Sequence, residues 1–259
     1  MSITIDPDWW KTLFDEVYLV TDARSVCNEE ITRREIDLFC NLIPMHPQDR
    51  ILDLCGGHGR HAMELCKRGI LNCTVFDYAR PLLKIGAENA ERQNYPVRFI
   101  QGDARDTKLA EEEYDHVLIL GNSLGYIPDK NADLFILRES FRVLKSKGWF
   151  LLEVTDGNTV REKLSPIAWH EMGDDVVVCR ERELKNDAIC AREMVLSKQK
   201  GLIRDKSYSI HLYEPQQLAA LVTKAGFIDV QICSDSATCY SEEDLGCMNH
   251  RLIISARKP

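Results

Sequence analysis

The segment Ile51–His61, ILDLCGGHGRH, constrains the fold more than any other part of the chain. It begins as a short apolar run, passes through three glycines between positions 56 and 59, and enters a helical pattern at His61. Glycine permits a sharp backbone turn and lets a ligand approach without a Cβ atom in the way. The N-terminus of the following helix offers free N–H groups that suit a carboxylate or a phosphate. The segment therefore predicts a strand, a ligand-binding turn and a helix.

Short apolar runs and helical patterns alternate through the middle of the chain. We expect strands over 51–54, 73–76, 97–101, 116–120 and 149–154, and helices over 61–68, 81–93 and 133–144. Such alternation forms βαβ units around a parallel sheet, with right-handed crossovers. With a final strand pair at 227–233 and 251–256, it predicts an α/β fold: a Rossmann-like, doubly wound, mostly parallel seven-stranded sheet.

Two further regions flank this sheet. Apolar residues at helical spacing predict an N-terminal helical lid with helices over 8–18 and 28–42, the second capped by Asn28. Strand-like segments at 176–182, 189–198 and 207–213 predict an antiparallel C-terminal extension beside or over the C-terminal edge of the sheet, followed by a helix at 214–225. We interpret 1–259 as a single domain with a lid (1–48), a cofactor-binding core (49–156), a substrate-side β insertion (157–213) and a C-terminal helix and strand pair (214–259).

Composition limits the kind of protein. A length of 259 residues suits one α/β domain, and no window is long and apolar enough to predict a membrane span. The N-terminus carries Asp6 and Asp8 and does not read as a secretory signal. The ten cysteines are scattered without a CxxC pair, so we expect reduced thiols in a cytoplasmic protein and no metal site. A net charge of −8 argues against nucleic acid as a partner.

Acidic residues mark the ends of the first three expected strands. Asp53 precedes the glycine loop, Asp77 follows 24 residues later, and Asp103 ends the third strand. An acid after the second strand can bind both ribose hydroxyls of a nucleotide, and Asp103 suits an adenine amino group. Of the three glycine positions in the dinucleotide fingerprint, only Gly57 is glycine here, and Arg60 stands at the third. The spacing favours a mononucleoside with an amino-acid tail over NAD.

Five segments resemble the motifs of class I S-adenosylmethionine-dependent methyltransferases. The stretch 53–62 is similar to the first motif, DLGCGTGRHA, with Cys55 in place of its first glycine. The other four segments are 76–77, 101–106, 114–126 and 144–152. This resemblance implies S-adenosylmethionine as the cofactor and methyl transfer as the activity.

The resemblance also implies roles for individual residues. The backbone of 54–59 would line the amino-acid end of the cofactor, and Asp77 would hold its ribose. Tyr78 and Asp103 would contact the adenine, and 120–122 would lie beneath the sulfonium. The full implied set, with two lid residues first, is Tyr18, Thr32, Asp53, Leu54, Cys55, Gly56, Gly57, Gly59, Asp77, Tyr78, Asp103, Ala104, Leu120, Gly121 and Asn122.

Side chains that could act as a base or contact the acceptor are Tyr18, His170, His211 and Tyr213, with Tyr240 and His250 as further candidates. A positioned base contributes roughly 10²–10⁴-fold, whereas a carboxylate nucleophile needs none. Each candidate also has a structural interpretation: His211 could cap a sheet edge, and His170 could simply be exposed. We assign His58 and His61 to turn and helix packing, because two histidines alone do not form a metal site.

The favoured function is methyl transfer to a small molecule, by O- or N-methylation through in-line displacement, with the strands between 176 and 213 shaping the acceptor pocket. A protein or RNA methyltransferase is an alternative, although the segment 122–125 lacks the two prolines of the NPPY motif. A regulatory protein that binds S-adenosylmethionine without catalysis is a third. Arg60 makes a nicotinamide dehydrogenase the weakest interpretation.

Overall fold

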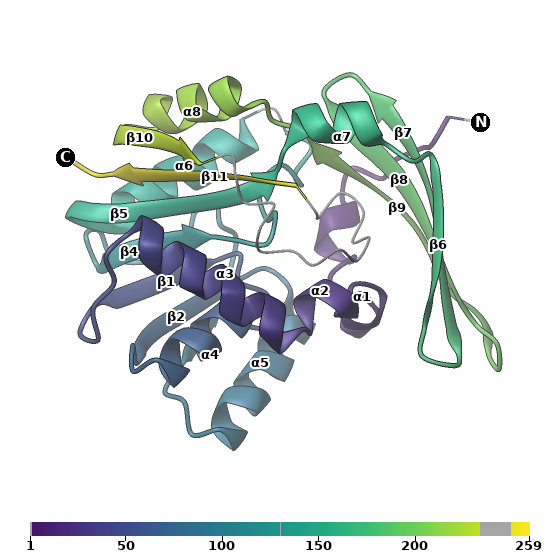
Figure 1. The fold of residues 1–259 in the computed structure, drawn as a ribbon, viewed down its shortest axis with the longest axis horizontal. Helices are drawn as coiled ribbons and strands as arrows, with labels where there is room; N and C mark the ends of the chain where they lie inside the picture. Colours follow the sequence, from purple (N-terminus) through teal and green to yellow (C-terminus); the bar gives the residue numbers. More distant parts are fainter. Residues whose placement is uncertain (1, 130, 234–249) are drawn as a thin grey trace.

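The computed structural model describes residues 2–129, 131–233 and 250–259. Its centre is a seven-stranded sheet with the order β10-β11-β5-β4-β1-β2-β3 (Figure 1). The strands are β1 (Arg50–Leu54), β2 (Asn72–Asp77), β3 (Arg98–Gln101), β4 (Tyr114–Ile119), β5 (Leu144–Thr155), β10 (Ile228–Cys233) and β11 (Arg251–Arg257). β11 is antiparallel to both its neighbours, and β1 to β5 pair in parallel. This confirms the predicted fold class, and the reversal of order between β1 and β4 marks where ligands bind in such sheets.

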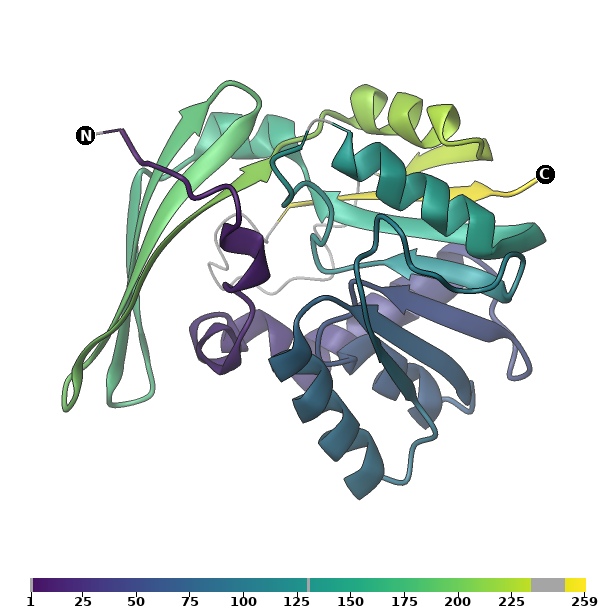
Figure 2. The same ribbon diagram turned by 180° about the vertical axis from the view of Figure 1, so that it is seen from behind.

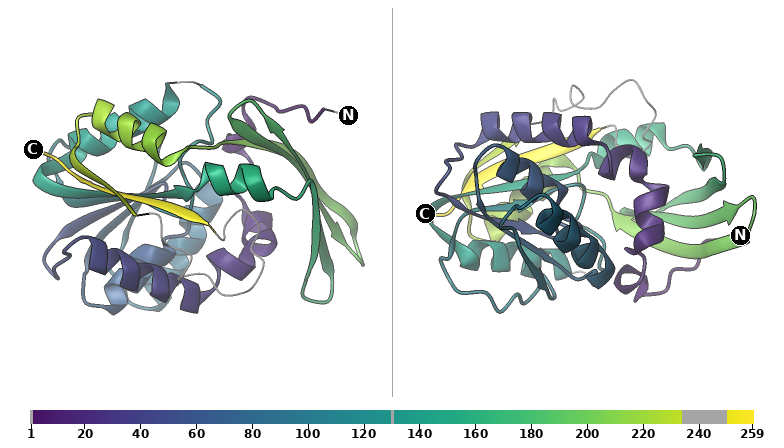
Figure 3. Two further views of the ribbon diagram at one scale, coloured as in Figure 1. Left: turned by 45° about the horizontal axis from the view of Figure 1, so that its top comes forward. Right: turned by 90° about the horizontal axis from the view of Figure 1, so that it is seen from below.

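Helices cover both faces of this sheet (Figures 1 and 3). α6 (Ala132–Val143) and α8 (Pro215–Lys224) lie on one face, and α3 (Glu29–Leu42), α4 (Arg60–Lys67) and α5 (Arg80–Arg92) lie on the other. Side chains of β1 alternate between the two layers: Leu52 and Leu54 join the α6–α8 core, and Ile51 joins the α3–α4 core. A strand buried on both faces must be apolar on both, and each such side chain stabilises the fold by about 1.5–3 kcal/mol.

A separate four-stranded antiparallel sheet stands beyond the carboxyl ends of the parallel strands, with the N-terminal segment between the two sheets (Figure 2). Its strands are β6 (Ile167–Met172), β7 (Val176–Lys185), β8 (Ala188–Ser197) and β9 (Gly201–His211). Only three strands were expected, and both β6 and α7 (Gly157–Lys163) were missed. Among the described strands, β6 pairs only with β7, and it exposes Ile167 and Trp169, so its sequence shows no buried apolar face.

The expected helix over 8–18 is wrong. The segment forms a 3-10 helix η1 (Trp9–Lys11), an irregular stretch, and then two short helices, α1 (Glu16–Thr21) and α2 (Ala23–Val26). Asp15 caps α1 by accepting hydrogen bonds from two backbone N–H groups, which starts the helix there. The Trp9 ring packs at a tilt against those of Tyr126 and Tyr208, with centroid distances of 5.6 and 5.7 Å, so tertiary packing replaces the local helical periodicity. The second lid helix matches α3, with Asn28 accepting a hydrogen bond at its N-cap as expected.

The remaining expectations concern membrane spans, the cysteines, and the two further candidate residues Tyr240 and His250. Within the described ranges, no helix has the length and apolarity to cross a membrane. The eight cysteines in the same ranges are free thiols. Tyr240 lies outside the described residues. His250 lies just before β11, and its backbone carbonyl accepts a hydrogen bond from Asp156.

Candidate functional site

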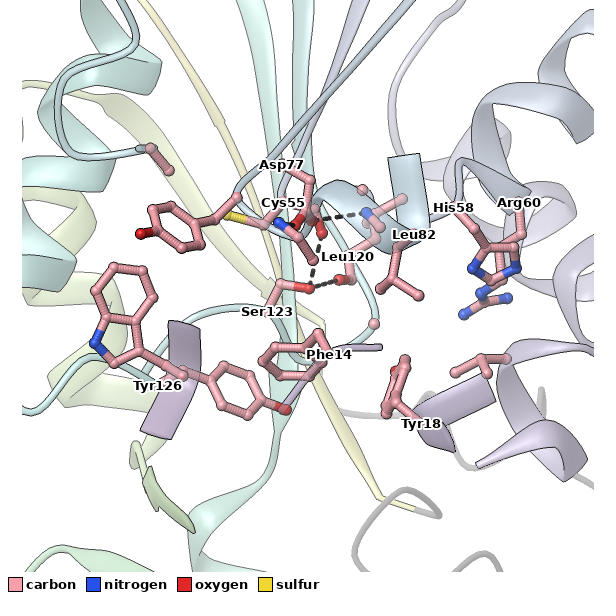
Figure 4. Close-up of a pocket in the computed structure, with 18 of the residues that line it drawn as sticks. Phe14, Tyr18, Cys55, His58, Arg60, Asp77, Leu82, Leu120, Ser123 and Tyr126 are labelled. Carbon is pink, nitrogen blue, oxygen red and sulfur yellow. Dashed lines mark hydrogen bonds between the residues drawn. The ribbon is translucent and has the colours of Figure 1, made fainter. Parts of the chain in front are cut away.

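A cavity of about 1050 Å³, including the space at its mouth, opens at the carboxyl ends of β1 to β4 (Figure 4). Its floor comes from the glycine loop and from the residues that follow the other three strands. Its cover comes from the N-terminal segment, including Trp10, Phe14 and Tyr18. The expected cofactor residues that line it are Tyr18, Cys55, Gly56, Gly57, Asp77, Tyr78, Asp103, Ala104, Leu120 and Gly121.

The glycine loop turns sharply beneath this cavity. Cys55 and Gly57 both adopt positive φ, at 62° and 56°, and the N–H of Cys55 donates to the Phe76 carbonyl at 2.7 Å. Gly56 needs to be glycine for a different reason, because a Cβ atom there would lie 2.5 Å from the Asp53 carboxyl carbon. The loop thus packs directly on Asp53 while presenting backbone to the cavity.

Asp53 supports the loop from below. Its side chain is 1% exposed and is not among the residues that line the cavity. Burial raises the pKa of Asp53, and nearby His61 and Arg60 lower it. Asp53 was expected to contact the cofactor. The structure places it under the loop instead, outside the cavity lining.

Asp77 lies at the centre of the floor. One carboxylate oxygen accepts from the Gly57 N–H at 2.8 Å and the other from the Ala79 N–H at 2.7 Å. Burial raises the pKa of Asp77, and these backbone hydrogen bonds lower it. Each carboxylate oxygen can accept a second hydrogen bond, so Asp77 can still take a pair of hydroxyl groups from the cavity side.

One wall of the cavity combines an ion pair with aromatic rings. Arg105 makes bidentate contact with Asp103, with its shortest distance 2.6 Å, and holds the pKa of Asp103 below its usual value. The Arg105 guanidinium lies 5.4 Å from the Trp10 ring, and Trp10 packs on Tyr78 at 4.8 Å. Asp103 thus has a protein partner in addition to any base amino group, and the flat rings suit a heteroaromatic base.

The opposite end of the cavity carries Arg60 and His61, which share the Glu35 carboxylate. Arg60, at the start of α4, donates to the buried Glu35 carboxylate and to the Thr32 hydroxyl at 2.8 Å. His61 contacts the same Glu35 carboxylate at 3.0 Å. Arg60 and His61 line the cavity, whereas Thr32 does not. The expected role of Thr32 over the cofactor is corrected, because its hydroxyl is used to hold Arg60.

A second cavity of about 880 Å³, with a lining of apolar and charged side chains, adjoins the first. It lies between the inner face of the antiparallel sheet and the N-terminal helices, and the two cavities share Phe14, Tyr18, Val26, Gly121 and Tyr126. Asn122 lines this second cavity rather than the first. Its amide donates to the Tyr126 hydroxyl at 3.2 Å and accepts from the Thr155 N–H at 2.8 Å, which fixes its positive φ of 62°.

The expected catalytic side chains do not come together. Tyr18 lines both cavities, and burial raises its pKa well above the usual value. His170, in β6, faces the Thr21 carbonyl at 3.3 Å and lines neither cavity. Tyr213 is buried with its hydroxyl donating to Asp133, and His211 packs edge-on against it at 4.5 Å. His170, His211 and Tyr213 therefore make contacts within the fold, and none of them lines either cavity.

Several cavity residues had no signal strong enough to be found in the sequence. Trp10, Phe14 and Tyr126 were grouped with packing residues or motif neighbours, yet all three line the first cavity. Gly59 and Leu54 belong to the loop without lining the cavity, since Gly59 caps α4 and Leu54 faces the α6–α8 core. Within the described residues no cluster of side chains could hold a metal ion.

The cavity fits S-adenosylmethionine in its chemistry. Backbone and a basic side chain face one end, a paired acceptor lies in the middle, and aromatic rings form the other end. An amino-acid tail, a ribose and an adenine need this sequence of environments. A Cβ atom at Gly56 or Gly59 would be 2.5 or 2.9 Å from neighbouring side chains, so the loop is built without them.

Comparison with known proteins agrees with this geometry. Residues 51–148 match the family model described as a methyltransferase domain. The chain is 22% identical over 213 residues to putative methyltransferase YqeM of Bacillus subtilis, covering 81% of this chain and 84% of the relative. It is 25% identical over 216 residues to glycine/sarcosine N-methyltransferase of Aphanothece halophytica, covering 81% and 78%.

Solved structures share the fold across nearly the whole chain. The CcbJ methyltransferase of Streptomyces caelestis superposes with a TM-score of 0.76 at 17% identity, covering 98% of this chain and 99% of that one. An S-adenosylmethionine-dependent methyltransferase of Clostridium acetobutylicum gives 0.73 at 15% identity, covering 93% and 96%. The sheet order and the glycine loop define a nucleoside-binding α/β fold. Residues 51–148 thus resemble a methyltransferase domain, and the solved structures that share the fold include S-adenosylmethionine-dependent methyltransferases, which supports S-adenosylmethionine as the cofactor.

Proposed function

We propose that this protein transfers a methyl group from S-adenosylmethionine to a small molecule bound in the second cavity. The observation that carries this proposal is the junction of the two cavities, where Gly121, Tyr18 and Tyr126 belong to both linings. Bound S-adenosylmethionine supplies an activated methyl group, so the main work of the protein is to position the acceptor and to exclude water. Aromatic side chains at the junction suit both tasks.

The nucleophile is inferred from the charges around the second cavity. Its two carboxylates, Asp22 and Glu193, are each held by Arg180 at 2.9 and 2.8 Å. The described part of the lining contains no histidine. Both carboxylates are thus already engaged in ion pairs. The acceptor therefore carries its own lone pair, as a neutral amine or an ionised oxygen, which covers both N- and O-methylation.

The cavity geometry favours a small acceptor over a protein or RNA. The second cavity is enclosed by the antiparallel sheet and the N-terminal helices, and its lining includes Leu13, Ile189, Ile210 and Leu212. An apolar, concave site with a few polar groups is typical of small-molecule recognition. Relatives named as glycine/sarcosine N-methyltransferases lend support to an amine.

Calorimetric titration of the purified protein with S-adenosylmethionine, S-adenosylhomocysteine and NADH tests cofactor binding. We expect micromolar affinity for both adenosyl compounds and none for NADH. A screen of amines, amino acids and phenols for acceptor-dependent release of S-adenosylhomocysteine then tests turnover. Tighter binding of NADH would contradict the proposal, and adenosyl binding without turnover on any acceptor class would favour a regulatory protein.

A further inference from the structure

The inner face of the antiparallel sheet presents three arginines to the second cavity. Two of them are neutralised within the protein. Arg180 on β7 and Arg204 on β9 both pair with the buried Glu193, at 2.8 and 3.3 Å, and each has a second carboxylate partner. Their charges are therefore used to hold the sheet to the N-terminal segment.

Arg182 differs from these two. It lies two positions after Arg180 on the same strand, so its side chain points to the same face, and it lines the cavity in a half-buried position. Within residues 2–129, 131–233 and 250–259, the ion pairs of this face are those of Arg180 and Arg204, and none involves the Arg182 guanidinium. Its planar fork is suited to bidentate contact with a carboxylate.

The strand register sets a small side chain beside Arg182. Arg182 pairs with Ala191 on β8, and Ala191 pairs with Tyr208 on β9. All three line the cavity. On the cavity face a small side chain therefore stands between the Arg182 guanidinium and the Tyr208 phenol.

A second polar group in the cavity also lacks a protein partner. Thr155, at the end of β5, is 4% exposed, and its hydroxyl has no hydrogen-bond partner in the described part of the chain. The same residue lines the second cavity. Its backbone N–H is fixed by Asn122 at 2.8 Å, so its position is rigid. Buried hydroxyl groups are nearly always hydrogen-bonded, which points to a polar ligand at this place.

The rest of the cavity decides what kind of anion fits. Apolar side chains surround these polar groups, and they are Leu13, Ile189, Ile210 and Leu212. A bare inorganic ion would leave this apolar surface uncovered. An organic anion would cover it and bring its charge to Arg182.

We propose that the acceptor is an organic carboxylate whose anionic group binds Arg182, with the Thr155 hydroxyl as a further polar contact in the cavity. This rests on the proposed function for the identity of the cavity as the acceptor site. Binding of the carboxylate at the sheet turns the opposite part of the acceptor toward Gly121 and Tyr126, where the two cavities meet. Arg182 is thus a specificity-determining residue.

Ligand-observed NMR titration tests this with benzoate, neutral benzamide and phenyl phosphate as probes, with and without saturating S-adenosylhomocysteine. We expect benzoate to bind and benzamide not to. Arg182→Gln should weaken benzoate by about tenfold or more, the loss of a charged hydrogen-bonded pair. Arg192→Gln is the matched control, because Arg192 is exposed and pairs with Asp205 at 2.6 Å, away from the cavity. It should leave benzoate affinity unchanged.

Equal affinity for benzoate and benzamide, or unchanged benzoate binding in Arg182→Gln, would overturn the proposal. So would phenyl phosphate binding more tightly than benzoate, which would indicate a phosphorylated ligand. The thermal midpoint and the S-adenosylhomocysteine affinity of Arg182→Gln report whether the variant is folded, and Arg182→Lys, which keeps the charge, should retain part of the binding. If S-adenosylhomocysteine itself fails to bind, the proposed function fails, while the benzoate titrations without it still test Arg182.

Discussion

Glu35 in α3 and Arg60 at the start of α4 form an ion pair in which the Glu35 side chain is 1% exposed. The pair connects the N-terminal lid to the glycine loop, since Arg60 follows that loop directly and lines the first cavity. Burial alone would raise the pKa of Glu35, but Arg60 and His61 hold it below its usual value of 4.5. The carboxylate is therefore charged in the folded protein at neutral pH.

Glu35→Gln should lower the free energy of unfolding by about 3 kcal/mol, because removing one partner of a buried pair leaves a charge poorly compensated. Urea unfolding at pH 7 measures this. Glu30→Gln on the same helix is the control, because Glu30 pairs with Arg33 and Arg34 at the surface, and its midpoint should not change.

A carboxylate whose pKa is lowered by folding stabilises the fold at pH values above its pKa in the unfolded chain, and this effect is lost as pH falls. The difference between wild type and Glu35→Gln should therefore shrink below about pH 4.5. Equal midpoints for both variants at pH 7 would show that the pair is not structural.

Asp77→Asn should weaken S-adenosylhomocysteine binding by about 10- to 100-fold, the usual effect of a lost hydrogen bond to a charged group. An amide oxygen can still accept from one of the two N–H groups that Asp77 holds, but its NH₂ group opposes the other. Calorimetry measures the affinity. Asp106→Asn is the control, since Asp106 is exposed, pairs with Lys108 at 2.5 Å and does not line the cavity. Wild-type affinity in Asp77→Asn would remove Asp77 from the ribose site.

Much of this fold is readable in the sequence because local pattern and tertiary role agree there. β1 is apolar because it is buried on both faces. Gly57 and Gly59, which follow it, adopt the positive φ that glycine allows. Asp77 ends β2 and lines the first cavity, as expected from its place at a strand end, and its role at the ribose stays a prediction. The alternation of strand and helix patterns along the chain was enough to predict the parallel sheet, without knowledge of contacts between distant residues.

The lid and the second sheet were harder to predict because their residues serve distant partners. Trp9 and Trp10 fit a helical pattern, yet they pack on Tyr208 and Tyr78, which come much later in the chain. Arg182 gives no local sign of its position, because only the register of β7 and β8 sets it beside Ala191. His170 and His211 line neither cavity, and the sequence of a strand does not by itself show which groups its side chains face.

Tyr213 illustrates the last point and allows a direct test. Its hydroxyl donates to Asp133, which also accepts from the Gly125 N–H at 3.1 Å. Tyr213→Phe should therefore lower the free energy of unfolding by about 1–2 kcal/mol, because a buried acceptor loses one donor. Cofactor affinity should stay within about twofold, since the effect is on stability alone. Chemical denaturation and calorimetry on the same preparation separate these two effects.

The control for Tyr213→Phe is Tyr95→Phe, which removes a hydroxyl that makes no hydrogen bond within the described part of the chain, and it should be neutral. If Tyr213→Phe lost cofactor or acceptor binding at unchanged stability, the original assignment of Tyr213 to the site would stand.

His58 should make the stability of the protein depend on pH in a defined window. Burial first, and then Arg60 and His61, lower the pKa of His58 from 6.5 to about 4. The unfolded chain therefore binds a proton that the folded chain rejects between these two values, and stability falls as pH falls from about 6.5 to about 4. At pH 5 this one group should lower the free energy of unfolding by about 2 kcal/mol.

Urea unfolding between pH 7.5 and pH 4.5 should show a shallower pH dependence in His58→Gln than in wild type. His46→Gln, which removes an exposed histidine before β1, should keep the wild-type slope. Parallel curves for His58→Gln and wild type would mean that His58 is solvated and protonates freely in the folded protein, and its place in the cavity lining would then need another explanation.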